Sequence, residues 1–281
     1  MDTFFNAARP GTTATLGDKT FELPILYFRD DLFLLFYTAD YNKVKALMPS
    51  GKLHPVRLPK GRSLIGVGAF NYVDTSIGPY GEVGMIVPTV HSTSSPPMLL
   101  PALMEARYPG FGMLVLHLPV TTIEARDGGR GLWGYTKFIA DMDFKITPEF
   151  MECRMSENRL SEKDDHILTM RVAKKGITIR DKKPMITYSV KDGNLIRTII
   201  PQKSTFRLAL APEDSYLELG NHPAARTIAD LDLAKKPLLS RYYSERNAIL
   251  PEGAVIEEGV RPLDGYFGKD RNGRHEVNYL E

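Results

Sequence analysis

The chain has 281 residues, of which 43% are hydrophobic and 25% are charged, and its formal net charge at pH 7 is +2. This length and composition allow a sizeable buried core, and the near-balanced charge with scattered basic residues argues against a nucleic-acid-binding protein. No apolar run approaches the length of a membrane span, and the N-terminus lacks the basic and apolar regions of a signal peptide.

The single cysteine, Cys153, cannot form an internal disulfide. Together with the missing signal peptide, it leads us to expect a protein of the reducing cytoplasm. No linker rich in glycine, serine or proline interrupts the chain, and no low-complexity tract or repeat is evident. We therefore expect residues 1–281 to form a single domain.

The first predicted element is a short helix that Asp40 caps at its N-terminus, with Val44 and Leu47 on one side and Pro49 ending it. Further along, the residues before Glu82 are rich in glycine and proline and predict a turn. From the residues alone, Glu82 is a polar loop residue.

The stretch 96–110 is the next distinct feature. Residues 98–104 are strongly apolar and are interrupted by Pro101. We expect this segment to be part of the core or of an interface. The alternative is a lid over a cavity, and its methionines would suit a larger apolar substrate.

An aromatic, glycine-punctuated run follows at 129–139. If the run is extended, side chains alternate between its two faces. One face then carries Trp133, Tyr135, Lys137 and Ile139. An ammonium group walled in by such residues is poorly hydrated, which favours the neutral and nucleophilic amine. The alternative is an ordinary strand lysine whose ammonium reaches solvent.

The rest of the chain contains more strand than helix. Lys191 to Asn194 form a predicted hairpin turn between two of the strands, and a second helix is predicted near Asn221, with Pro223 in its first turn. Predicted strands span 112–118, 166–172, 176–180, 185–190 and 195–200. Many short strands with few helices indicate a mainly β fold of the barrel or sandwich type.

Two motifs resemble those of the acetoacetate decarboxylase family. The family signature reads roughly Gly-Arg-Glu, two residues, Gly, an aromatic, Pro-Lys-Lys, and an upstream signature ends in Tyr-x-Glu. The upstream block here is 74–82, and softer similarities extend the match over roughly 20–260. The first signature is matched by Gly129, Arg130, Gly134, Tyr135 and Lys137.

The resemblance implies a mainly antiparallel, barrel-like β fold that encloses Lys137. It further implies that Lys137 condenses with the ketone of a small keto acid, that no cofactor or metal takes part, and that the chain assembles into a homo-oligomer. Glu82 would orient the lysine or move protons, and Arg29 would bind the substrate carboxylate. The alternative for Arg29 is a solvated arginine paired with a neighbouring aspartate.

The same resemblance leads us to place Trp133, Tyr135 and Arg130 in the substrate site as well. An arginine flanked by glycines can equally stabilise a turn. Six histidines are scattered along the chain, and none has metal-ligand spacing with another histidine or with the cysteine.

The sequence departs from the family pattern at several positions near the lysine. The second lysine of the motif is Phe138 here, which alternation predicts to face away from Lys137. Gly131 and Thr136 replace the motif glutamate and proline, and Gly68 stands where a second acid is expected.

We therefore expect a Schiff-base-forming lyase, with decarboxylation of a β-keto acid as its first candidate reaction. One alternative is aldol or dehydration chemistry through the same lysine. Another is a non-catalytic barrel that binds a small molecule.

Overall fold

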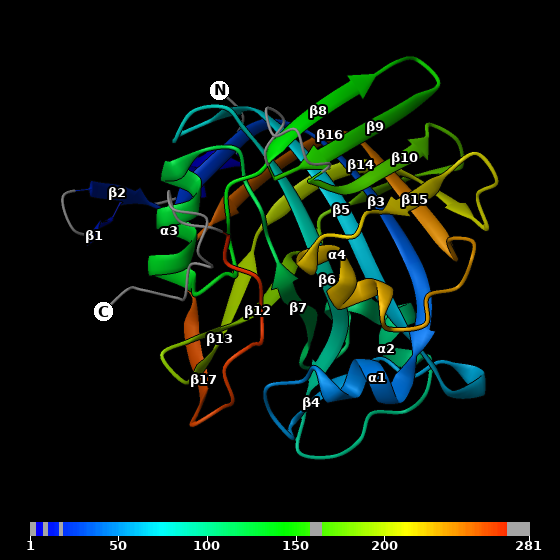
Figure 1. Cartoon of the computed structure of the whole chain (residues 1–281). Coiled ribbons are helices and arrows are strands. Elements are labelled where there is room, and N and C mark those ends of the chain that lie inside the picture. Colours follow the sequence, from blue (N-terminus) through cyan, green and yellow to red (C-terminus); the bar gives the residue numbers. More distant parts are fainter. Residues whose placement is uncertain (1–3, 8–10, 17–18, 158–164, 269–281) are drawn as a thin grey trace.

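The computed structural model describes residues 4–7, 11–16, 19–157 and 165–268, and most of them lie in three β-sheets (Figure 1). The largest sheet has eleven strands in the order β11-β14-β16-β3-β5-β6-β7-β12-β13-β17, with β4 paired to β6. Its strands are β3 (Ile25–Asp40), β4 (Leu53–Pro55), β5 (Arg62–Thr75), β6 (Tyr80–His91), β7 (Phe111–His117), β11 (Ile177–Asp181), β12 (Met185–Lys191), β13 (Asn194–Ile200), β14 (Gln202–Leu210), β16 (Leu239–Leu250) and β17 (Ala254–Glu258).

Two smaller sheets accompany it. One has the order β15-β10-β9-β8 and the other pairs β1 with β2. Their strands are β1 (Thr12–Leu16), β2 (Lys19–Leu23), β8 (Asp141–Ile146), β9 (Phe150–Ser156), β10 (His166–Ala173) and β15 (Tyr216–Leu219). The helices are short: η1 (Phe5–Ala7), α1 (Tyr41–Ala46), η2 (Pro59–Gly61), α2 (Leu100–Met104), η3 (Glu105–Arg107), α3 (Ile123–Trp133) and α4 (Pro223–Ala229).

The mainly antiparallel β fold that the sequence predicts is confirmed. Among the described strands, only β7 and β12 pair in parallel. The large sheet curves strongly, so that β13 approaches β16, but its end strands β11 and β17 do not pair with each other. The sheet is therefore barrel-like without closing into a barrel (Figure 1).

The long central strand β3 is buried on both faces. Phe33, Leu35 and Tyr37 pack into one apolar core, which also contains side chains of β9, β10 and α4. The alternating residues Leu32 and Leu34 pack into a second core on the opposite face of the sheet. Because side chains alternate along a strand, β3 separates the two cores, and the second core is the one that contains the cavity described below.

Local signals in the sequence explain several element boundaries. The five predicted strands are confirmed as β7, β10, β11, β12 and β13, and the hairpin turn lies between β12 and β13. The carboxylate of Asp40 caps α1 by accepting a hydrogen bond from the Lys43 N–H at 2.9 Å. The helix predicted near Asn221 is confirmed as α4, which His222 caps and which has Pro223 in its first turn. No helix in the described part of the chain is long and apolar enough to span a membrane.

Candidate active site

The segment that precedes Lys137 is helical, so the prediction of an extended run is wrong for residues 129–133. Helix α3 begins after Thr122, whose hydroxyl caps it, and ends at Gly134, which has φ +67°. The N–H of Tyr135 donates to the carbonyl of Gly129 at 3.1 Å, which completes a glycine C-cap. Of the motif glycines, Gly134 ends the helix while Gly129 lies inside it, and only the residues after Gly134 are extended.

The extended segment after α3 pairs with the chain that follows β7. Val120 forms a parallel bridge with Ile139 and an antiparallel bridge with Glu82. Its N–H donates to the Phe138 carbonyl at 2.9 Å. Val120 thus connects β6 to the lysine segment, and this pairing brings Lys137 next to Glu82, 55 positions away in the sequence.

Alternation holds along this extended segment. Tyr135 and Lys137 line the cavity, whereas Phe138 is fully buried in the opposite core. The Phe138 ring packs edge-on against Tyr266, with ring centroids 5.0 Å apart, and stacks on His222. The prediction that Phe138 faces away from Lys137 is confirmed.

Lys137 and Glu82 form a buried pair. The lysine Nζ lies 2.7 Å from Glu82 Oε2, and the two residues are only 5% and 6% exposed. The lysine stem crosses α3 at Gly129, where a Cβ would lie 2.4 Å from the lysine Cε. Gly129 is therefore required by this close approach. Nζ lies about 6 Å from the ring centroids of Tyr80 and Tyr135.

Buried phenols surround Glu82. The hydroxyl of Tyr72 donates to Glu82 Oε1 at 3.2 Å, while the hydroxyls of Tyr27 and Tyr80 share a hydrogen bond at 3.0 Å. Burial raises the pKa of Tyr27, Tyr72 and Tyr80, and it raises the pKa of Tyr135 to about 12. The phenols therefore remain protonated near neutral pH and can act as donors. Both carboxylate oxygens of Glu82 have a partner, since Tyr72 donates to Oε1 and Lys137 donates to Oε2.

The cavity is enclosed by β3, β5, β6, β7, β12, β14 and β16, and its lining is mostly apolar. Lys137 and Glu82 lie in its wall, and a charged rim of Glu105, Lys183 and Arg241 marks a more exposed part. Glu105 pairs with both cations, which lowers the pKa of its carboxyl despite partial burial. Within the described chain, no cluster of histidine, cysteine, aspartate or glutamate side chains is arranged to hold a metal ion.

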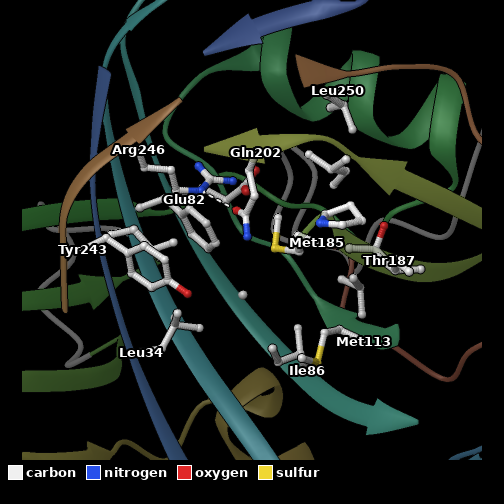
Figure 2. Close-up of a pocket in the computed structure, with 18 of the residues that line it drawn as sticks. Leu34, Glu82, Ile86, Met113, Met185, Thr187, Gln202, Tyr243, Arg246 and Leu250 are labelled. Atoms are coloured by element: carbon white, nitrogen blue, oxygen red, sulfur yellow. Dashed lines mark hydrogen bonds between the residues drawn. The ribbon is translucent and has the colours of Figure 1, made fainter. Parts of the chain in front are cut away.

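Sequence reasoning missed Arg246, which contributes a buried guanidinium to the cavity wall. Its Nη1 pairs with Asp30, and its Nε donates to Gln202 Oε1 at 3.1 Å. Figure 2 shows Arg246, Gln202 and Glu82 on one side of the cavity. Burial alone lowers the pKa of Arg246, but the Asp30 carboxylate outweighs it and keeps the guanidinium charged. No local motif in the sequence connects 246 with 30, since the contact arises from pairing of β16 with β3.

The residues expected to bind substrate are distributed differently from the prediction. Arg29 was expected to bind the substrate carboxylate, but it is exposed on β3 and does not line the cavity. Its neighbour Asp30 is the buried residue at this point of the strand. Arg130 holds the backbone, with its Nε donating to the Lys137 carbonyl at 2.7 Å. Trp133 donates to the Pro251 carbonyl and packs behind the lysine beside a smaller pocket. Of the expected wall residues, Tyr135 alone lines the larger cavity.

The stretch 96–110 lies at the rim of this cavity. Glu105 and Ala106 contribute to the lining, whereas Leu103 is 77% exposed. The segment was expected to belong to the core or to an interface. The core is wrong for its apolar residues 98–100 and 103, because α2 and the two residues before it expose them to solvent, and the interface stays a prediction.

Three comparisons with known proteins bear on this geometry. The sequence matches the family model described as acetoacetate decarboxylase (ADC) over residues 12–258. No protein among those with curated functions matches the chain. Several solved structures share the fold, and the three described next do so at sequence identities of 17% or less.

An acetoacetate decarboxylase from Legionella pneumophila subsp. pneumophila str. Philadelphia 1 superimposes with a TM-score of 0.59 at 17% identity, covering 84% of this chain and 88% of that one. The enduracididine biosynthesis enzyme MppR, complexed with pyruvate, superimposes with a TM-score of 0.59 at 8% identity, and the match covers 84% of this chain and 91% of that one. An acetoacetate decarboxylase-like enzyme from Sphingomonas wittichii RW1 superimposes with a TM-score of 0.54 at 11% identity, and the match covers 84% of this chain and 92% of that one.

The buried pair predicts a characteristic pattern of stability. Lys137→Met and Glu82→Leu should each lower the free energy of unfolding by about 3–5 kcal/mol, because each leaves a buried charge without its partner. The double variant should recover most of that loss. Urea denaturation measures all three, and Lys175→Met, which breaks the exposed Lys175–Asp214 pair, is the control that should change little. Single variants as stable as the parent would show that the pair is hydrated.

The orientation of Phe138 makes a second prediction. Phe138→Lys should destabilise the protein, since loss of a buried phenylalanine costs about 3–5 kcal/mol before the new charge is counted. Leu103→Lys, at an exposed position, should leave the melting temperature nearly unchanged. A well-folded Phe138→Lys variant that decarboxylates acetoacetate faster would contradict the assigned orientation.

Proposed function

This chain belongs to the acetoacetate decarboxylase family, and from that premise we propose that it is a lyase that decarboxylates a β-keto acid through a Schiff base on Lys137. The observation that carries the proposal is the buried Lys137–Glu82 pair in the wall of a mostly apolar cavity. A lysine buried with a hydrogen-bonded carboxylate has both a reactive nitrogen and a partner for its proton.

The first step follows from the geometry of the pair. Transfer of one proton from Nζ to Glu82 Oε2, over the 2.7 Å hydrogen bond, converts two buried charges into a neutral amine and a neutral acid. The amine then attacks the ketone carbon of the substrate, and a proton passes from the attacking nitrogen to the ketone oxygen, which gives a carbinolamine. The protonated Glu82 supplies a proton to the departing hydroxyl, which leaves as water and gives an iminium.

Decarboxylation uses the iminium as an electron acceptor. The bond between the α-carbon and the carboxylate breaks, and its electron pair moves to the iminium nitrogen. Carbon dioxide departs, and the group that remains on Lys137 is an enamine. Protonation of the enamine carbon restores an iminium, and water hydrolyses it to release the ketone and free Lys137. Tyr72 holds Glu82 in place through these steps by donating to its second oxygen.

Arg246 supplies the positive charge for the substrate carboxylate in this proposal, in place of Arg29. Asp30 and Gln202 occupy Nη1 and Nε, and Nη2 has no hydrogen-bond partner within the described chain. A guanidinium with an unused donor in the cavity wall can bind a carboxylate with a charge-assisted hydrogen bond.

Condensation chemistry through the same lysine is the second candidate. Two departures separate this site from the usual family pattern: Gly68 stands where a second acid is expected, and Phe138, which is buried in the opposite core, stands where the second lysine is expected. MppR, which shares the fold, binds pyruvate and a condensation product of pyruvate with an aldehyde. Product analysis with a keto acid alone and with an added aldehyde distinguishes the two reactions. If borohydride traps no keto acid on the protein, the third alternative, a non-catalytic binding protein, is favoured.

The Schiff base is tested by chemical trapping. Borohydride with a β-keto acid should add the mass of the reduced ligand to the peptide that contains Lys137, as measured by mass spectrometry. Lys137→Arg should abolish the label, while Lys175→Arg, at an exposed lysine, should keep it. Labelling that survives Lys137→Arg would contradict the proposed nucleophile.

The role of Arg246 predicts a loss that depends on the substrate carboxylate. Arg246→Lys keeps the charge beside Asp30 but removes the guanidinium geometry. We expect kcat/KM for the keto acid to fall roughly 10- to 150-fold, since a hydrogen bond to a charged group contributes about 1.5–3 kcal/mol. Borohydride trapping of a ketone that lacks the carboxylate should be almost unaffected. Arg29→Lys is the matched control, and equal losses for both ligands would contradict carboxylate binding.

A further inference from the structure

The cavity extends well beyond the groups that perform the chemistry. Its volume of about 130 Å³ corresponds to roughly four water molecules, each of which takes about 30 Å³ in the liquid. Acetoacetate, by contrast, carries only a methyl group beyond its ketone. Bound at Lys137, a substrate of that size would not reach Ile86 and Met113, which line the far end of the same cavity.

The wall next to Glu82 lacks side chains. In the register of β5 and β6, Phe70 pairs with Glu82, Gly68 with Gly84 and Gly66 with Ile86. Successive pairs on the same face lie about 6.6 Å apart along the strands, so the glycine pair follows directly after the Glu82 pair.

The two glycines open the wall in different ways. A Cβ on Gly84 would make only ordinary contacts, the nearest at 3.4 Å from Leu118, and Gly84 lines the cavity. The space next to Gly68 is occupied by Leu34, whose Cδ2 would lie 2.7 Å from a Cβ there. The bare backbone of Gly84 and the side chain of Leu34 therefore form a smooth apolar passage, and an acid at Gly68 would not fit without moving Leu34.

The passage continues into an apolar end. Ile86 lies two residues beyond Gly84 on β6, and Met113 projects from β7. Figure 2 shows Leu34, Ile86 and Met113 on the side of the cavity opposite Arg246 and Glu82. From Glu82 to Ile86 the strand spans roughly 13 Å. One side of the cavity thus offers a cation and the reactive pair. The other side is lined mainly by apolar side chains, and the charged rim begins beside it, where Arg241 pairs with Leu34 between β16 and β3.

We propose that the substrate is a β-keto acid with a medium-length apolar tail, and that the tail runs over Gly84 and under Leu34 toward Ile86 and Met113. This inference rests on the proposed function, because it takes the ketone at Lys137 and the carboxylate at Arg246 as its starting point. The tail displaces water from the apolar lining, which provides binding energy that acetoacetate lacks.

A chain-length series tests the inference. Acetoacetate, 3-oxohexanoate, 3-oxooctanoate and 3-oxodecanoate are compared by carbon dioxide release and by borohydride labelling of Lys137. We expect kcat/KM to rise roughly threefold to fourfold per methylene up to 3-oxooctanoate. Gly84→Val fills the passage and should lower the ratio of kcat/KM for 3-oxooctanoate over acetoacetate at least tenfold. Gly51→Val is the matched control, because a Cβ at Gly51 meets no atom within 4 Å.

The outcomes separate the two proposals. Labelling of Lys137 with no gain for longer chains, or an unchanged ratio in Gly84→Val, would overturn the apolar-tail inference and leave the proposed function in place. If no keto acid labels Lys137, the proposed function fails. In that case calorimetry with the 2-alkanones from acetone to 2-nonanone still decides the inference: affinity that rises with length and falls in Gly84→Val supports it, and a flat series overturns it.

Discussion

The burial of one lysine beside one glutamate is the constraint on which the rest of this structure depends. Neither charge is stable alone in an apolar wall, so each requires the other within hydrogen-bond distance. That requirement accounts for Gly129, which lets the Lys137 stem cross helix α3. It also accounts for the two β-bridges of Val120, which connect β6 with the lysine segment. The motif glycines and the sheet register serve the same pair.

A second buried pair gives the cavity its polarity. Asp30 and Arg246 lie on neighbouring strands β3 and β16, and the guanidinium keeps its charge because the carboxylate is beside it. Together with the Lys137–Glu82 pair it places buried charge on one side of the cavity. Leu34, Ile86 and Met113 lie on the opposite side (Figure 2), and the remaining charged side chains are those of the more exposed rim. Strand β3 makes this possible by presenting alternate residues to two separate cores.

Local patterns in the sequence predicted the features that depend on neighbouring residues. Alternation and capping rules account for strands β7 and β10–β13, for the Asp40 cap, and for the orientation of Phe138 away from Lys137. The helix at 123–133 was missed because its glycines argue against a helix, while Thr122 and Gly134 mark its ends. Arg246 was beyond reach for another reason: its contact with Asp30 depends on strand pairing across more than 200 residues, which no local pattern specifies.

The central claim is that the nitrogen of Lys137 reacts with a ketone while Glu82 stays beside it. A crystal structure of the protein after borohydride reduction with a β-keto acid tests this claim most directly. The account predicts continuous density from Lys137 Nζ to a ligand carbon, with Glu82 within hydrogen-bond distance of the new amine. Density for an unmodified Lys137 still bound to Glu82, with the ligand unattached or at another lysine, would contradict it.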